Sequence, residues 1–155
     1  MSSKKKINTL MFRNKRAYFD YDISEKFESG IMLYGSEVKS IRDSKVSLVG
    51  SFCYFNSVGE LFIKDMDIAI YDDASYNNHD PKRDRKLLMH KKELVKLKAK
   101  TDEKGFGLIP LRLYPNERNI FKVEIALAKG RKKADKRSYL KEREVKREMK
   151  DAMGN

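Results

Sequence analysis

The lysines and arginines at the two ends of the chain are the residues best suited to chemistry with a ligand, and that chemistry is the binding of phosphate. Residues 1–16 contain six basic residues and no acidic one, and residues 129–150 contain eleven basic residues against four acidic ones. Residues 17–128 hold 18 of each sign, so the net charge of +12 belongs to the ends. Because Lys and Arg displace the counterions condensed on nucleic acid, basic ends on a neutral body predict a nucleic-acid-binding protein.

A second basic cluster lies within the neutral body, at Lys82, Arg83, Arg85 and Lys86. We expect it to open a long helix over Lys82–Lys104, in which apolar residues recur at steps of three and four. Basic residues at a helix N-terminus oppose the helix dipole, so their presence there favours contact with phosphate over a role in helix stability. The sequence therefore predicts that Arg83, Arg85 and Lys86 bind RNA.

Residues that would carry catalysis or hold a metal are sparse. The two histidines, His79 and His90, have no third ligand at the spacing of a metal site, and His90 is expected to stack or hydrogen-bond at a binding surface. The single cysteine, Cys53, excludes an internal disulfide and a multi-cysteine metal site, and we expect it to be buried. The sequence contains no P-loop, nucleophile elbow or zinc-protease motif. We therefore expect a protein that is not an enzyme and uses no cofactor or metal.

The basic C-terminal segment leaves the predicted body at Gly130. Ser138–Met153 is compatible with a helix, but its apolar residues are too few to form a stripe that packs on a core. An isolated helix of this length is marginal in water. We therefore expect a tail over residues 130–155 that is disordered when free and becomes helical on a partner that supplies phosphates. The alternative is a tail that only aids solubility, a role that acidic residues serve better.

The neutral body is predicted to consist mainly of short strands. Aromatic and branched residues between turn formers predict strands over 17–23, 31–34, 52–55 and 61–63, and a hairpin over 106–128 with its turn around Pro115–Glu117. A short helix is expected over 37–42, with Ser36 as its N-cap. About six strands and about three helices predict a small closed antiparallel barrel of the OB-like kind, and an α+β sandwich is the alternative.

These features divide the chain into three parts, namely a flexible basic arm over 1–13, an RNA-binding barrel over 14–129 and the tail over 130–155. No apolar run approaches the roughly 20 residues that cross a bilayer. The basic residues at the N-terminus are not followed by the apolar segment of a secretory signal. We expect a cytoplasmic monomer that does not associate with membranes.

Six stretches of the sequence resemble, in order, the small protein B (SmpB) family of SsrA-binding proteins. The motifs that carry the resemblance are Asn14–Ala17, Glu28–Ile31, Gly35–Arg42, Asp80–Leu88, Ala126–Gly130 and Asp135–Arg143. The resemblance implies an OB-like barrel of six strands with three helices, and the role of protein partner to tmRNA in bacterial ribosome rescue. It implies that the barrel binds the tRNA-like domain of tmRNA, and that the tail lies as a helix in the empty mRNA channel of a stalled ribosome.

The resemblance also implies roles for single residues. In the body, those that would contact RNA are Asn14, Lys15, Arg16, Glu28, Leu88 and His90. In the tail, those that would serve accommodation are Gly130, Arg131 and Lys132. Those that would contact ribosomal RNA near the decoding centre are Asp135, Lys136 and Arg137. The chain departs from the family pattern at Ala134, where members commonly carry a His or an aromatic residue, and at Arg131, where the Lys-Lys after the glycine becomes Arg-Lys.

Basic extensions on a small barrel also suit other classes of protein. A structural ribosomal or ribosome-assembly protein would bind ribosomal RNA permanently and stay with purified subunits through a high-salt wash, whereas an adaptor would not. An RNA-cleaving or RNA-modifying enzyme would turn over RNA in a reaction that a single carboxylate substitution abolishes.

Overall fold

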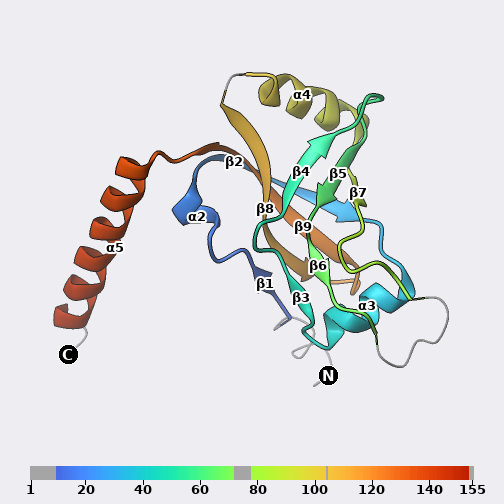
Figure 1. Ribbon diagram of the computed structural model, residues 1–155, viewed down its shortest axis with the longest axis horizontal. Coiled ribbons are helices and arrows are strands. Elements are labelled where there is room, and N and C mark those ends of the chain that lie inside the picture. Colours follow the sequence, from blue (N-terminus) through green and yellow to red (C-terminus); the bar gives the residue numbers. More distant parts are fainter. Residues whose placement is uncertain (1–9, 72–77, 104, 154–155) are drawn as a thin grey trace.

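The fold consists mainly of antiparallel strands, with four helices in the part of the chain that the structure describes (Figure 1). A computed structural model describes residues 10–71, 78–103 and 105–153, so residues 1–9 of the expected basic arm lie outside the described part. The strands are β1 (Phe12–Arg13), β2 (Tyr21–Ile31), β3 (Val46–Ser47), β4 (Phe52–Phe55), β5 (Leu61–Lys64), β6 (Asp67–Ile68), β7 (Arg85–Leu88), β8 (Phe106–Pro115) and β9 (Phe121–Gly130). The helices are α2 (Ala17–Asp20), α3 (Gly35–Arg42), α4 (Lys91–Thr101) and α5 (Lys133–Met153).

Seven strands form one antiparallel sheet in the order β1-β8-β4-β5-β7-β2-β9. An additional pairing joins β8 to β9, so β8, β4, β5, β7, β2 and β9 each have a hydrogen-bonded neighbour on both sides. β3 and β6 pair in a separate two-stranded sheet. β1 pairs with β8, with Phe12 opposite Leu113, so the last residues of the expected arm lie on the sheet.

Alternate residues of the central strands build the core. Leu61 and Ile63 of β5 and Val123 and Ile125 of β9 are completely buried. Successive side chains of a strand point to opposite faces, so every second residue is apolar and faces inward. Cys53 of β4 is buried among them as predicted, and burial raises the pKa of its thiol.

The first elements of the body differ from the prediction. Ala17–Asp20 was expected to start a strand but forms the single turn α2, with Ala17 buried in a small second cluster. β2 then runs from Tyr21 to Ile31, so it is longer than the strand predicted over 17–23, and residues 32–34 of the strand predicted over 31–34 are not in a strand. Gly30 serves a close approach here, because a Cβ at this position would lie 3.2 Å from the Cβ of Leu88.

The predicted hairpin over 106–128 is confirmed, and the strands predicted over 52–55 and 61–63 also pair as a hairpin, for reasons that their turn residues explain. β4 and β5 pair across a turn in which Gly59 adopts a φ of 84°, a conformation that favours glycine. β8 and β9 pair across a turn in which the side chain of Asn116 accepts hydrogen bonds from the backbone N–H groups of Arg118 and Ile120. Local turn chemistry therefore specified both hairpins.

The helix predicted over Lys82–Lys104 is wrong in its first part. Arg85–Leu88 is the strand β7, which pairs with β5 on one side and β2 on the other, and α4 begins only at Lys91. Alternation in β7 buries Arg85 and Leu87 and turns Lys86 and Leu88 outward. Four residues of this composition fit the periodicity of a strand and of a helix equally well. β7 is a strand because β5 and β2 are present to pair with it.

α3 confirms the short helix predicted after Gly35, although its N-cap is Tyr34 rather than Ser36. The N–H of Tyr34 donates a hydrogen bond to Oε1 of Glu37 at 2.7 Å, which satisfies one of the free donors at the helix start. α5 follows β9 and stands apart from the sheet, at the left of Figure 1. Most of its side chains are exposed, as its thin apolar content predicts.

Candidate nucleic-acid interface

Three of the residues that the resemblance assigns to RNA lie together where β2 and β7 run side by side. Gly30 of β2 is directly opposite Leu88 of β7, and Glu28 precedes Gly30 by two positions. His90 follows β7 as the N-cap of α4. Together with Lys122 of β9, these residues line an open groove of about 700 Å³, which we call the Glu28 groove. Leu88 is 48% exposed and offers the groove an apolar surface.

A chain of polar contacts across the outer face of β2, β8 and β9 holds Glu28 in place. The hydroxyl of Tyr114 donates a hydrogen bond to the Glu28 carboxylate. The guanidinium of Arg112 lies 4.5 Å from the centre of the Tyr114 ring and pairs with Glu124 at 3.1 Å. Burial and the hydrogen bond to the Glu28 carboxylate raise the pKa of Tyr114 above its ordinary value.

Sequence reasoning missed these three supporting residues. Arg112, Tyr114 and Glu124 each lie on a predicted strand, at alternate positions facing away from the core. Polar side chains at period two on the outer face were the signal that could have found them.

Asn14 holds the chain against β8. Its side chain is buried, and Nδ2 donates a hydrogen bond to the carbonyl of Pro110 at 3.0 Å. Its backbone N–H donates to the carbonyl of Leu111 at 2.8 Å. Lys15 and Arg16 follow in exposed positions, so Asn14 fixes the segment that presents these two cations.

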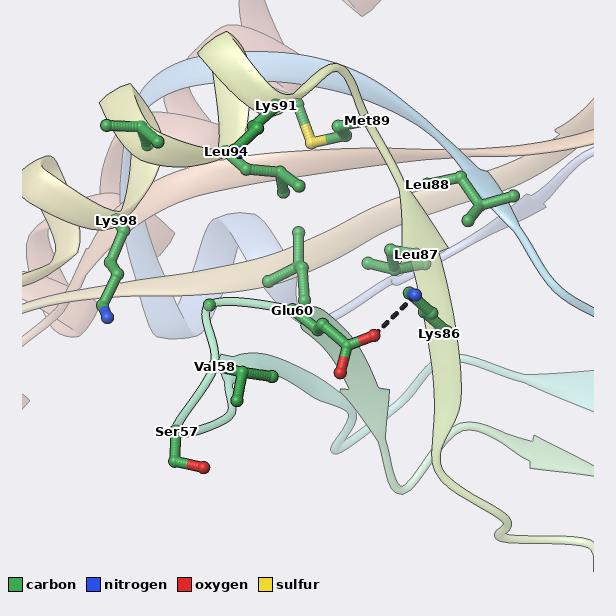
Figure 2. Close-up of a pocket in the computed structure, with 13 residues that line it drawn as sticks. Ser57, Val58, Glu60, Lys86, Leu87, Leu88, Met89, Lys91, Leu94 and Lys98 are labelled. Atoms are coloured by element: carbon green, nitrogen blue, oxygen red, sulfur yellow. Dashed lines mark ion pairs between the residues drawn. The ribbon is translucent and has the colours of Figure 1, made fainter.

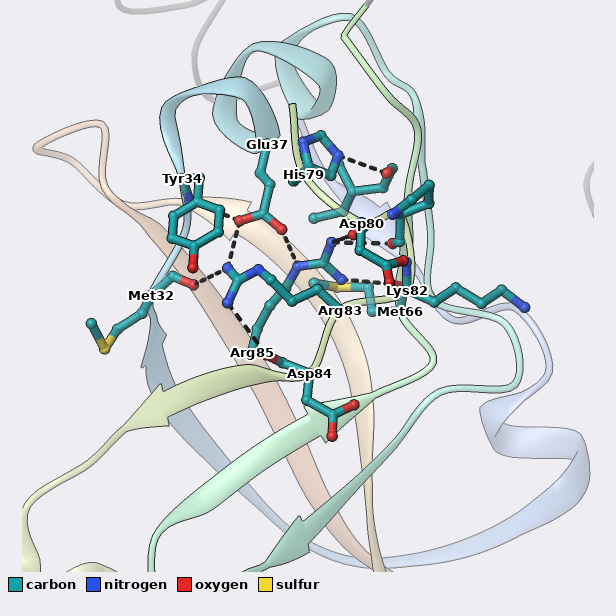
Figure 3. A network of polar contacts seen from close by, with 12 residues as sticks. Met32, Tyr34, Glu37, Met66, His79, Asp80, Lys82, Arg83, Asp84 and Arg85 are labelled. Carbon is teal, nitrogen blue, oxygen red and sulfur yellow. Dashed lines mark hydrogen bonds and ion pairs between the residues drawn. The ribbon is translucent and has the colours of Figure 1, made fainter. Parts of the chain in front are cut away.

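The basic cluster at residues 82–86 does not form the predicted phosphate site (Figure 3). Arg85 is completely buried, and its Nε donates to Oε2 of Glu37 at 2.5 Å while its Nη1 donates to the carbonyl of Met66 at 2.6 Å. Arg83 donates from Nη2 to Oε1 of Glu37 at 2.6 Å, and its guanidinium lies 4.0 Å from the centre of the exposed Tyr34 ring. The prediction that Arg85 contacts RNA is therefore wrong, because its charge is neutralised inside the protein.

Glu37 is the acceptor at the centre of this network. Burial alone would raise the pKa of its carboxyl, but hydrogen bonds from Arg83, from the Tyr34 N–H and from Arg85 outweigh burial and hold the pKa below its ordinary value. His79 is buried nearby, with Nδ1 at 2.8 Å from the Ser36 hydroxyl and Nε2 at 2.9 Å from the carbonyl of Ile68. The contacts tie α3 to the segment before β7.

A second groove lies between α4 and the β4–β5 turn (Figure 2). It has a volume of about 540 Å³ and an apolar floor with lysines around it. Lys86, the remaining member of the basic cluster, lies at this groove, and its Nζ pairs with Glu60 at 2.6 Å. Val58 and Val95 are 74% and 66% exposed on its two sides.

The start of the tail is anchored to α2. The N–H of Arg131 donates to the carbonyl of Asp20 at 2.8 Å, and its Nε lies 3.2 Å from the carbonyls of both Tyr18 and Tyr21. Nζ of Lys136 lies 3.3 Å from Oδ1 of Asp20. Two of the residues expected to meet the ribosome are thus engaged with the body in this structure.

The other tail residues named from the sequence are exposed. Gly130 ends β9, and the N–H of Lys132 donates to Oδ2 of Asp135 at 3.3 Å, close to the start of α5. An acidic residue in the first turn of a helix is favoured by the helix dipole. Arg137 and Ala134 face solvent. The expectation that the tail is disordered in the free protein stays a prediction.

Metal-ligating side chains do not gather anywhere in the described residues, where no group of three or more His, Cys, Asp or Glu is found. His79 is hydrogen-bonded beside the Glu37 network, and His90 is the N-cap residue of α4. None of the helices that the structure describes is both long and apolar enough to cross a bilayer.

Nearly the whole described chain matches one family model. The model, described as SmpB protein, covers residues 11–155. The chain belongs to the SmpB family. An SsrA-binding protein of Bacteroides thetaiotaomicron is 50% identical over 137 residues, which are 88% of this chain and 91% of that protein. An SsrA-binding protein of Cytophaga hutchinsonii is 48% identical over 149 residues, which are 96% and 97% of the two chains.

A solved structure of an SmpB protein is also similar. It is described as "tmRNA-SmpB: a journey to the center of the bacterial ribosome", and it matches with a TM-score of 0.66 and 49% sequence identity. The match covers 79% of this chain and 85% of that one. The resemblance indicated by the six motifs is therefore confirmed, and the large antiparallel sheet with its helices is that of an SmpB protein.

Proposed function

We propose that this SmpB protein binds the tRNA-like domain of tmRNA and delivers it to stalled ribosomes for trans-translation, as an RNA-binding adaptor in the cytoplasm and not as an enzyme. The observation that carries the proposal is the 49% identity, over 79% of the chain, to the protein of a solved tmRNA–SmpB structure. The family model runs from residue 11 to residue 155, and the Cytophaga hutchinsonii relative matches over 96% of this chain, which supports a shared function.

The six strands that have partners on both sides form, in this proposal, a closed OB-like barrel. The succession of pairings from β8 through β4, β5, β7 and β2 to β9, and from β9 back to β8, supports closure. Closure leaves none of these six strands with a free edge, and OB-like barrels offer strand side chains and loops to nucleic-acid backbones.

The Glu28 groove is the proposed contact with tmRNA. Structured RNA is recognised through phosphates, 2′-hydroxyls and unpaired bases. Lys122 supplies a charge for phosphate, Leu88 and His90 supply surfaces for a base, and Glu28 is a fixed acceptor for a hydroxyl or an amino group. Lys15 and Arg16 add exposed cations on the segment that Asn14 holds.

The tail acts in this proposal as a sensor of the empty mRNA channel. α5 contains eight basic and five acidic residues and few apolar ones, so a channel lined by RNA phosphates is a better environment for it than a protein core. Gly130, Arg131 and Lys132 would let the helix reorient, and Asp135, Lys136 and Arg137 would meet ribosomal RNA. An mRNA already in the channel would exclude the helix.

A deletion tests the division of labour between body and tail. A chain that ends at Lys129 should bind the tRNA-like domain of tmRNA with an affinity close to that of the full chain, and it should support no tagging of peptides on stalled ribosomes. Loss of RNA binding by a folded truncation would contradict the proposal. Retention of the full chain on ribosomal subunits through a high-salt wash would favour a structural ribosomal protein instead.

A further inference from the structure

A groove of about 770 Å³ lies between α5 and the outer face of the sheet, and we call it the α5 groove. Four separate segments line it, namely the residues before and within α2, strand β2, the β8–β9 hairpin and the first half of α5. It adjoins the Glu28 groove through Arg112, which lines the α5 groove and stacks on Tyr114, the partner of Glu28.

The charge of the α5 groove is strongly positive. Five cations line it, and they are Arg13, Lys15, Lys26, Arg112 and Arg143. The single carboxylate in the lining, Glu124, is already paired with Arg112 at 3.1 Å. Within the described residues, the other four cations have no carboxylate at ion-pair distance. A concave surface with uncompensated positive charge attracts a polyanion.

Two tyrosines stand among these cations. Tyr18 and Tyr139 both line the groove, one from the body and one from α5. The guanidinium groups of Arg131 and Arg143 lie 4.7 Å and 5.8 Å from the centre of the Tyr139 ring. Aromatic rings beside cations are the arrangement on which unpaired bases stack while their phosphates are neutralised.

We infer that the α5 groove binds single-stranded RNA, with phosphates on Arg13, Lys15 and Arg143 and a base on Tyr139, while Lys26 is held by its contact with Tyr18. The inference rests on the proposed function and adds to it a second RNA site, next to the Glu28 groove and built partly by the tail. A base inside a duplex cannot reach an aromatic ring in this way, so the site selects unpaired nucleotides.

The site exists only while α5 is docked, and Asp20 holds the docking contact. Its carboxylate lies 3.3 Å from Lys136 Nζ and 3.3 Å from Arg16 Nε, and its carbonyl accepts from the Arg131 N–H. Burial tends to raise the pKa of Asp20, but the hydrogen bonds from Arg16 and Lys136 outweigh it and keep the carboxyl ionised. RNA in the groove and docking of α5 therefore favour each other, by the reciprocity of linked equilibria.

Binding of a fluorescein-labelled oligoadenylate of eight nucleotides by the full chain, followed by fluorescence anisotropy, tests the site. Tyr139→Ala should weaken binding by about fivefold or more, the lower end of what the loss of one base–aromatic stack produces. Arg143→Gln should weaken it and also flatten the dependence of log affinity on log salt. Arg147→Gln is the matched control, because Arg147 is an exposed cation of α5 that does not line the groove. Equal effects of Arg143→Gln and Arg147→Gln, or no binding of the oligonucleotide by the wild type, would overturn the inference.

Asp20 positions α5, and its substitution should change RNA affinity in the direction opposite to the one that electrostatics alone predicts. Removing a carboxylate near a polyanion tightens binding if electrostatics alone act. If the docked helix builds the site, Asp20→Asn should instead weaken oligoadenylate binding by about threefold or more. Equal or tighter binding would overturn the role of the docked tail. The tRNA-like domain of tmRNA is titrated in parallel with every variant, with far-ultraviolet circular dichroism to verify folding. If that RNA binds normally while the groove variants have no effect on oligoadenylate, the groove inference fails and the proposed function stands.

Discussion

The Glu37 carboxylate and the Arg85 guanidinium form an ion pair at 2.5 Å, and neither side chain is exposed. Arg85 lies on a strand between two others, and Glu37 lies on the helix α3. The pair therefore fastens α3 to the sheet from inside. Removing one partner of such a pair leaves the other charged and buried. This costs far more stability than breaking an ion pair that is exposed to water.

Substitution of Glu37 is accordingly expected to destabilise the protein severely. Glu37→Gln should lower the free energy of unfolding by about 3–5 kcal/mol, because Arg85 and Arg83 lose their shared counter-charge. Urea denaturation followed by circular dichroism measures the change. Glu60→Gln, which removes the exposed partner of Lys86, should lower it by less than about 1 kcal/mol. Equal losses in the two variants would show that burial of the Glu37 pair has no special weight.

The same carboxylate predicts the acid sensitivity of the fold. The folded-state pKa of Glu37 is below its ordinary value of 4.5, so in that range the unfolded chain binds more protons than the folded one. The contribution of Glu37 to stability is thus fully present above its ordinary pKa and is lost as the pH falls through the folded pKa. Urea midpoints measured from about pH 7 to about pH 3 should fall more steeply for the wild type than for Glu37→Gln. Parallel curves would mean that other carboxyl groups govern the acid transition.

Gly30 is expected to be intolerant of a side chain. A Cβ there lies 3.2 Å from the Cβ of Leu88, so Gly30→Ala should force β2 and β7 apart and lower stability by about 1–3 kcal/mol. Because Leu88 lines the Glu28 groove, affinity for the tRNA-like domain should fall as well. Gly107→Ala in β8 is the control, since nothing lies within 4 Å of a Cβ at that position. A stable Gly30→Ala variant with normal RNA affinity would contradict this account.

The thiol of Cys53 should be unreactive in the native protein. Burial raises its pKa and removes it from solvent, and the thiolate is the form that reacts. Reaction with a disulfide reagent, followed by absorbance, should be slow in buffer and fast in denaturant. Rapid reaction in buffer would show that β4 opens readily.

The sequence was most informative where the structure depends on neighbouring residues. Both hairpins follow from turn formers such as Gly59 and Asn116, whose effect is confined to a few positions. β7 could not be found in this way, because its inner residue Arg85 pairs with Glu37, which is 48 positions away. The sequence alone does not show whether an arginine is buried or exposed. Here the distant Glu37 carboxylate is what allows Arg85 to be buried.

The candidate site shows the same limit. The tail and the residues around Glu28 emerged from charge and family motifs, but the support of Glu28 comes from Tyr114, 86 positions later in the chain. Asn14 belongs to a family motif and is buried, so membership in a motif did not reveal whether its side chain meets a ligand or holds the backbone. The register between β2, β8 and β9 determines both the contact of Tyr114 with Glu28 and the burial of Asn14. This register cannot be predicted from composition.

Arg131 and Lys132 are the two residues between the end of β9 and the start of α5, and Arg131 is clamped to three carbonyls around α2. A helix of 21 residues is about 31 Å long, so a pivot of about 10° at that clamp sweeps its far end through about 5 Å. α5 can therefore rotate about Arg131 as a rigid body, and a small backbone shift beside Tyr18 would produce a much larger displacement at Met153.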